Sequence, residues 1–113
     1  MIRVKIFRNN SGDIYGFRLT GHADYAKSGR DIVCSAVSVL TVNTINSIER
    51  FSDEHFSCET DDKKGGYLEL VLPAVKDGEH NHDVQLLLDA MLGGLNDIEN
   101  EYSRYISINE EVL

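Results

Sequence analysis

The sequence lacks the features that mark several protein classes. It has two cysteines, Cys34 and Cys58, which excludes the dense disulfide framework of small secreted domains. One proline excludes a proline-rich linker, and the N-terminus alternates charged and apolar residues without the apolar centre of a signal peptide. No stretch reaches the roughly 20 consecutive apolar residues that cross a bilayer. We therefore expect a cytoplasmic protein with reduced thiols and no membrane contact.

Positive charge is also scarce. Lysine and arginine together number 11 against 19 acidic residues, so the net charge is −8. Nucleic-acid binders need a basic surface, and we expect no direct contact with nucleic acid. The charge is uneven, with a net +3 over residues 1–51 and −11 over residues 52–113. The acidic half could attract a basic partner, although a solvated surface explains it more simply.

The order of the predicted elements indicates an α+β fold in a single domain, residues 1–113. Apolar periodicity predicts strands at 2–7 and 14–20, a helix at 31–52, strands at 56–60 and 67–72, a helix at 83–102, and a short last strand near 105–108. The order ββαββα(β) favours a mainly antiparallel sheet with two helices packed on one face. We expect Pro73 to end the fourth strand and residues 74–82 to form a polar connector.

The segment from Gly21 to Ser38 carries the residues that suggest chemistry. His22 follows the second strand, and Cys34 lies about three residues into the first predicted helix, for which Asp31 is the expected N-cap. A thiol there faces unpaired backbone N–H groups, which favour the thiolate and could stabilise an oxyanion. On a helical wheel Cys34 lies at the edge of the apolar stripe, with Ser38 on its side, and could be partly exposed at a cleft.

Other interpretations of these residues stay open. A cysteine is often a small apolar filler of the core, so Cys34 need not be reactive. The negative charge of Asp31 would oppose a thiolate, although Asp31 could instead orient His22. The hydroxyl of Ser38 could bond near the thiol or to a carbonyl of its own helix. The residues between Gly21 and the helix, 23–30, could form a lid that substrate orders, or an ordinary surface loop.

Two further sets of residues deserve separate interpretations. His55, Cys58, His80 and His82 could form a zinc site, but their spacing is not that of a zinc finger. Adjacent glycines at 93 and 94 interrupt the second helix, and each costs about 1 kcal/mol relative to alanine. We expect a compensating feature there: close packing within the chain, a dimer contact, or room for a substrate chain.

Two runs of residues, Gly21-His22-Ala23 and Gly29-x-Asp31-Ile32-Val33-Cys34-Ser35-Ala36-Val37-Ser38, resemble the signature of the ribosomal-processing cysteine proteases, the Prp family. The resemblance extends over essentially the whole chain, to the ending Gly94-Leu95-Asn96-Asp97-Ile98. It implies that His22 and Cys34 form a catalytic dyad. We treat Gly21, Asp31 and Ser38 as candidate supporting residues.

The resemblance also implies partners and conditions. Members of the family are small cytoplasmic homodimers that need no metal, and we expect no cofactor. The implied substrate is a large-subunit ribosomal protein precursor, from which the protease removes an N-terminal extension. The alternative is a non-enzymatic, ribosome-associated or partner-binding module on the same scaffold. Such a module has no need for a thiol near the start of a helix with a histidine nearby, so the reactivity of Cys34 separates the two.

Overall fold

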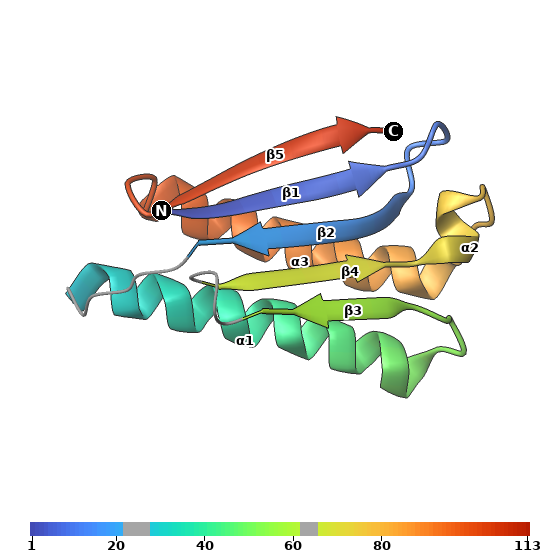
Figure 1. Cartoon of the computed structure of the whole chain (residues 1–113), viewed down its shortest axis with the longest axis horizontal. Coiled ribbons are helices and arrows are strands. Elements are labelled where there is room, and N and C mark those ends of the chain that lie inside the picture. The colour runs from blue at the N-terminus through green and yellow to red at the C-terminus, as the bar shows by residue number, and fades with distance from the viewer. Residues whose placement is uncertain (22–27, 62–65) are drawn as a thin grey trace.

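The computed structural model describes residues 1–21, 28–61 and 66–113, with the backbone alone for residues 28–31. Its elements are β1 (Ile2–Arg8), β2 (Ile14–Thr20), α1 (Ser28–Phe51), β3 (Ser57–Thr60), β4 (Tyr67–Val71), α2 (Pro73–Lys76), α3 (His82–Glu101) and β5 (Ile106–Val112). The strands form one sheet in the order β3-β4-β2-β1-β5. Neighbouring strands are antiparallel except β1 and β5, which run the same way (Figure 1).

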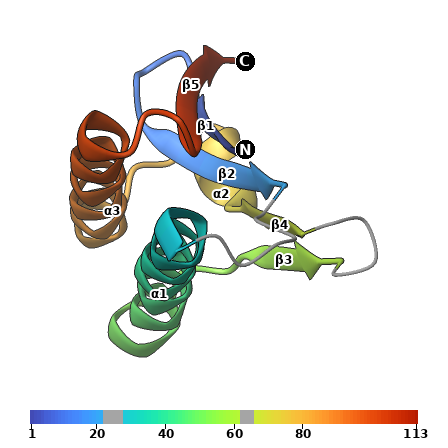
Figure 2. The same ribbon diagram turned by 90° about the vertical axis from the view of Figure 1, so that its left-hand side faces the viewer.

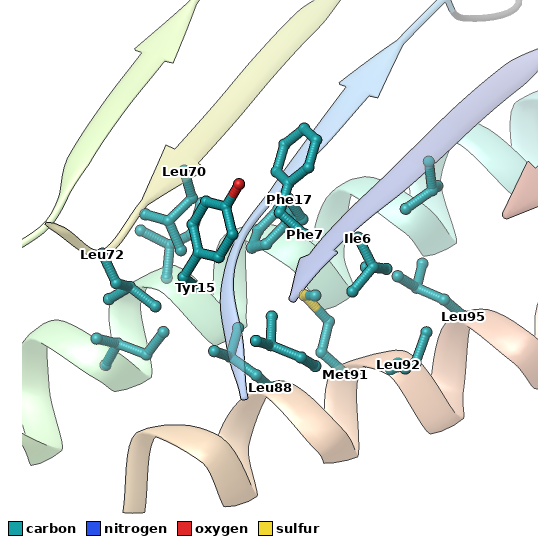
Figure 3. Close-up of a cluster of buried hydrophobic side chains, with 14 of the residues drawn as sticks. Ile6, Phe7, Tyr15, Phe17, Leu70, Leu72, Leu88, Met91, Leu92 and Leu95 are labelled. Atoms are coloured by element: carbon teal, nitrogen blue, oxygen red, sulfur yellow. The ribbon is translucent and has the colours of Figure 1, made fainter. Parts of the chain in front are cut away.

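Both long helices lie on one face of the sheet, which confirms the predicted α+β arrangement (Figure 2). The core lies between this face and the helices. Apolar side chains of β1, β2 and β4 meet those of α3 in Figure 3. The largest fully buried side chains include Ile6, Ile14, Phe17, Ile48, Leu70, Leu72, Leu88, Met91 and Leu95. Each stabilises the fold by about 1.5–3 kcal/mol through the removal of apolar surface from water.

The first helix begins earlier than the sequence suggested. We expected Asp31 to be the N-cap, but α1 starts at Ser28, so Asp31 is its fourth residue. Gly29 reads as a loop residue by propensity alone. A helical glycine costs only about 1 kcal/mol, however, and the packing of a 24-residue helix outweighs that cost.

Two further predictions near the C-terminal half need correction. Pro73 does not simply end β4, because it begins the short helix α2 inside the expected connector. Proline suits this position, since the first helical N–H has no partner within the helix. The last strand is longer than predicted, and it is parallel to β1. Its polar end has little strand propensity, but ion pairs from Glu110 to Arg8 at 2.7 Å and from Glu111 to Lys5 at 3.0 Å hold it against β1.

The apolar character of α1 also exceeds what the sequence analysis allowed. The stretch Ile32–Phe51 is long and apolar enough to cross a membrane by length and composition alone. Its serine, threonine and asparagine residues break up the apolar runs but lower the mean hydropathy only modestly. Val33, Val37 and Ile48 of this stretch are buried in the core, whereas Ile32, Val39, Val42 and Phe51 are exposed, so packing within the chain accounts for only part of its composition.

Gly94 lies where α3 meets α1. A Cβ atom built on Gly94 would lie 2.8 Å from Cδ2 of Leu40, whereas one on Gly93 would meet no described atom within 4 Å. Close packing within the chain therefore accounts for Gly94. The same observation does not account for Gly93.

The two glycines provide a matched pair for a stability test. Gly93→Ala should raise the free energy of unfolding by about 1 kcal/mol, because alanine favours the helix and meets open space. Gly94→Ala should gain less or lose stability, because its methyl group must displace Leu40. Urea denaturation of both variants measures the difference. Equal gains would contradict the close contact between α1 and α3.

Candidate active site

The thiol of Cys34 lies at the border of the core. Its neighbours on α1, Val33 and Val37, are buried, while Cys34 itself is half-buried and packs against the edge of the core cluster. This confirms the helical-wheel expectation that Cys34 lies on the shoulder of the apolar stripe. A side chain in this position contacts both packed hydrocarbon and the surface.

A cleft of about 380 Å³ opens beside this thiol, between α1 and the ends of three strands. It is lined by Leu19 of β2 and the following Gly21, by Cys34, Ser38, Thr41 and Val42 of α1, by Thr60 of β3, and by Gly66 with Tyr67 and Leu68 of β4, which begins directly after it. Both α1 and the strands contribute apolar side chains and hydroxyl groups to its lining. A cleft of this kind can hold a polypeptide segment against a nucleophile.

Gly21 holds the end of β2 at the edge of the cleft. Its N–H donates to the carbonyl of Gly66 at 3.1 Å, which continues the pairing of β2 with β4. Its φ of +78° is in the left-handed region, and a Cβ atom there would collide with the carbonyl oxygen of Met1. Glycine is therefore required by backbone conformation and by space. This candidate supporting residue lines the same cleft as Cys34.

Several predicted site residues lie partly or wholly outside the described structure. His22 belongs to residues 22–27, which are not described, although Gly21 immediately precedes His22 in the chain. The loop predicted at 23–30 lies mostly in the same stretch, but residues 28–30 are helical. Of Asp31, only the position in α1 is described.

The helix boundary changes the electrostatic interpretation of Cys34. With α1 starting at Ser28, Cys34 is the seventh helical residue and not the third or fourth. Only the first four N–H groups of a helix lack partners within it, and the effect of the dipole fades within the first turn. The expectation that these N–H groups face the Cys34 thiol is therefore wrong. The start of α1 therefore contributes little to any activation of this thiol.

Two hydroxyl groups follow Cys34 on the same side of α1. Ser38 lies one turn later, lines the cleft and is exposed. Within the described residues its hydroxyl has no protein hydrogen-bond partner, so it can bond to a ligand in the cleft. Thr41 is buried, and its hydroxyl donates to the carbonyl of Val37 at 2.8 Å. Thr41 is therefore occupied within its own helix.

Tyr67 is a cleft residue that the sequence analysis missed. Its hydroxyl donates to Oε2 of Glu69 at 3.1 Å, and Nε of Arg18 donates to the same oxygen at 2.7 Å. Burial, followed by the hydrogen bond to Glu69, raises the pKa of Tyr67 above its ordinary value. The phenol therefore stays protonated at neutral pH. The alternation of β4 places Tyr67 and Glu69 on one face, which is the signal that could have paired them.

The alternative zinc site does not form. Within residues 1–21, 28–61 and 66–113, no three histidine, cysteine or acidic side chains come close enough to hold a metal ion. His80 instead contacts Asp13 at 2.7 Å, and His82 contacts Asp83 at 3.1 Å.

Comparisons with known proteins agree on one family. Residues 1–107 match the profile of a family described as cysteine protease Prp. The chain is similar to the ribosomal processing cysteine protease Prp of Bacillus subtilis (strain 168), at 27% identity over 113 residues and 100% of both chains. The Staphylococcus aureus (strain Mu50) protein of that description is 34% identical over 110 residues, covering 96% of this chain and 98% of the other.

Two crystal structures have the same architecture. One is of a Streptococcus mutans protein, with a TM-score of 0.87, 32% identity, and coverage of 100% of this chain and 96% of the other. The second is of the essential ribosomal processing protease Prp from S. aureus in complex with a substrate peptide. Its TM-score is 0.83 at 31% identity, and the match covers 98% of this chain and 100% of that one.

The requirement for glycine at position 21 can be tested by substitution. Gly21→Ala should lower the free energy of unfolding by about 2 kcal/mol or more, because left-handed strain adds to the collision with Met1. Gly78→Ala is the control, since Gly78 also has positive φ, at +106°, but a Cβ there meets no described atom within 4 Å. Urea denaturation should show the larger loss for Gly21→Ala. An equal loss in both variants would contradict the role of the Met1 contact.

Proposed function

This chain belongs to the Prp family of cysteine proteases, which are hydrolases, and we propose that Cys34 is its nucleophile and His22 its general base. The family assignment removes the alternative of a non-enzymatic binding module. The observation that carries the proposal is the cleft, because Cys34 and Gly21 line it together. His22 follows Gly21 directly in the chain, so the segment that carries the proposed base starts from a residue that lines the Cys34 cleft.

The proposed reaction is an acyl transfer in two steps. His22 takes the proton from Sγ of Cys34, and the thiolate attacks the carbonyl carbon of the scissile bond. The C–N bond then breaks, His22 returns its proton to the leaving amine, and an acyl-enzyme remains. Water, deprotonated by His22, attacks the thioester and releases the carboxyl product. The exposed hydroxyl of Ser38 is a candidate donor to the oxyanion of both tetrahedral intermediates.

The proposed substrate is a large-subunit ribosomal protein precursor, from which this protein removes an N-terminal extension. Two observations support this: the relatives are described as ribosomal processing proteases, and a relative's crystal structure contains a substrate peptide. Proteins that bind ribosomal RNA are basic, and the net charge of −8 would attract such a substrate. We further propose that the protein acts as a cytoplasmic homodimer of single-domain chains, without metal, cofactor or contact with nucleic acid.

Removal of either proposed catalytic side chain tests the function. Cys34→Ala and His22→Ala should each lower kcat/KM by roughly 10⁴-fold or more, because nucleophile and base act as one unit. The measurement is cleavage of the extended ribosomal precursor, followed by mass spectrometry. His82→Ala, which removes an exposed histidine outside the cleft, is the control and should retain activity. A Cys34→Ala protein that still cuts the precursor would end the proposal.

The two thiols should also differ in reactivity. Partial burial raises the pKa of Cys58 above its ordinary value, so at neutral pH little of this thiol is in the reactive thiolate form. We expect iodoacetamide to label Cys34 faster than Cys58, as measured by peptide mapping. His22→Ala should slow labelling of Cys34 and leave that of Cys58 unchanged. Labelling of Cys34 that does not depend on His22 would argue against a paired base.

A further inference from the structure

β3 is an edge strand whose end borders the cleft that contains Cys34. The strand lies last in the sheet order, and its residues, Ser57–Thr60, are all exposed. Thr60 and Tyr67 line that cleft and also line a second hollow of about 560 Å³ beside β3, which includes Cys58 and Glu59. The cleft therefore continues along the strand. β3 is the strand at the outer edge of the sheet next to α1 (Figure 2), so an extended chain that leaves the cleft in this direction would run beside it.

The hydrogen bonds of the β3–β4 pair show which backbone groups face this edge. The N–H of Asp61 donates to the carbonyl of Tyr67. Two residues along the ladder Glu59 opposes Glu69, so Asp61 and Tyr67 continue the same register. In an antiparallel ladder, bonded pairs alternate with pairs whose N–H and C=O groups point outward. The odd-numbered residues of β3 are thus the ones whose backbone groups bond to β4. The N–H and C=O groups of Cys58 and Thr60 point away from β4.

The other edge of the sheet is treated differently. On β5, the N–H of Ile108 donates to Oε2 of Glu99 on α3 at 2.7 Å, so a side chain caps that edge at one position. Across the described residues, no side chain forms such a bond with the backbone of β3. An open edge is a template for another strand, and proteins usually block it. Here the open edge is the one beside the proposed nucleophile.

The register also fixes where the side chains of an added strand would lie. Cys58 and Thr60 oppose Leu70 and Leu68, so their side chains are on the helix side of the sheet. An added strand would place alternate side chains on this side, toward α1, where exposed Val42 lines the cleft. The intervening side chains would face solvent. Recognition would then combine main-chain bonds with an apolar contact at every second residue.

We propose that the substrate binds as an additional strand on β3, where its main chain exchanges hydrogen bonds with Cys58 and Thr60. The occupant is the extended segment next to the scissile bond, because the hollow beside β3 shares residues with the Cys34 cleft. This inference rests on the proposed function and specifies how that site holds its peptide. It requires the cut segment to be free of secondary structure of its own.

The first test methylates single backbone nitrogens of a peptide that spans the junction of the extension and the mature ribosomal protein. Cys58 and Thr60 supply acceptors two residues apart, so two amides, two positions apart, should be sensitive. We expect kcat/KM to fall about tenfold at each, the effect of one lost hydrogen bond. The amide between them points away from β3 and serves as the internal control. Sensitivity without this alternation would overturn the inference.

The second test removes one donor from the protein. Cys58→Pro loses the outward N–H, which an edge strand tolerates, whereas Cys58→Ala keeps it. We expect a KM about tenfold higher in the proline variant than in the alanine variant, with kcat little changed. Both variants leave Cys34 as the only thiol, so its alkylation rate and the unfolding midpoint report whether the site is intact. Equal KM values in folded variants would overturn the inference, and the methylation scan decides if Cys58→Pro does not fold.

Titration of the same peptides onto Cys34→Ala separates this inference from the proposed function. If methylation lowers the affinity at alternate positions, but the wild type does not cleave the parent peptide, the proposed function is overturned and strand addition is retained. If the wild type cleaves the parent peptide but the effect of methylation does not alternate along it, strand addition alone is overturned. A parent peptide that neither binds nor is cut overturns both. Sedimentation of the wild type and of Cys58→Pro tests the remaining candidate occupant of the β3 edge, a second copy of this chain. A dimer that Cys58→Pro dissociates would show that β3 pairs with a second copy, which overturns its use by substrate.

Discussion

The site depends on how the end of β2 is held. At Gly21 the chain must pair with Gly66, pass the carbonyl of Met1 with no room for a side chain, and adopt a left-handed conformation. Together these contacts fix where the sheet stops and where the segment that carries His22 begins. Because α1 passes beneath the same strand ends, Cys34 faces that point across the cleft. A rigid sheet end opposite a helix therefore places Gly21, the residue before His22, in the same cleft as Cys34.

The early start of α1 changes which physical effect would activate Cys34, the proposed nucleophile. Near a helix N-terminus, unpaired N–H groups could have both favoured a thiolate and bound an oxyanion. As the seventh residue, Cys34 lies about 4.5–9 Å along the axis from those groups, at the standard rise per residue. Activation then falls mainly to the proposed base. The oxyanion needs donors beyond the helix end, and Ser38 is the described residue best placed to provide one.

Sequence periodicity was sufficient for most of the fold, and it failed where tertiary contacts override local preference. The long helices and the first hairpin follow from regular apolar spacing. The polar end of β5 does not, because Arg8 and Lys5 from the other end of the chain hold its glutamates in a strand. The shoulder position of Cys34 could be read from a helical wheel. Tyr67 could not be assigned to the cleft, since its place there depends on how β4 pairs with β2 and β3.

The composition of β3 makes physical sense if the strand receives a peptide. Its four residues, Ser57–Thr60, are exposed, and two of them offer unsatisfied backbone groups to the surface beside the cleft. For structure alone, an open edge is a liability, which the carboxylate of Glu99 reduces on β5 by capping the N–H of Ile108. Main-chain pairing positions any extended substrate relative to Cys34, and the apolar contact at alternate residues then selects among sequences. Such a division allows a small enzyme to align a scissile bond without a deep, preformed pocket for every side chain.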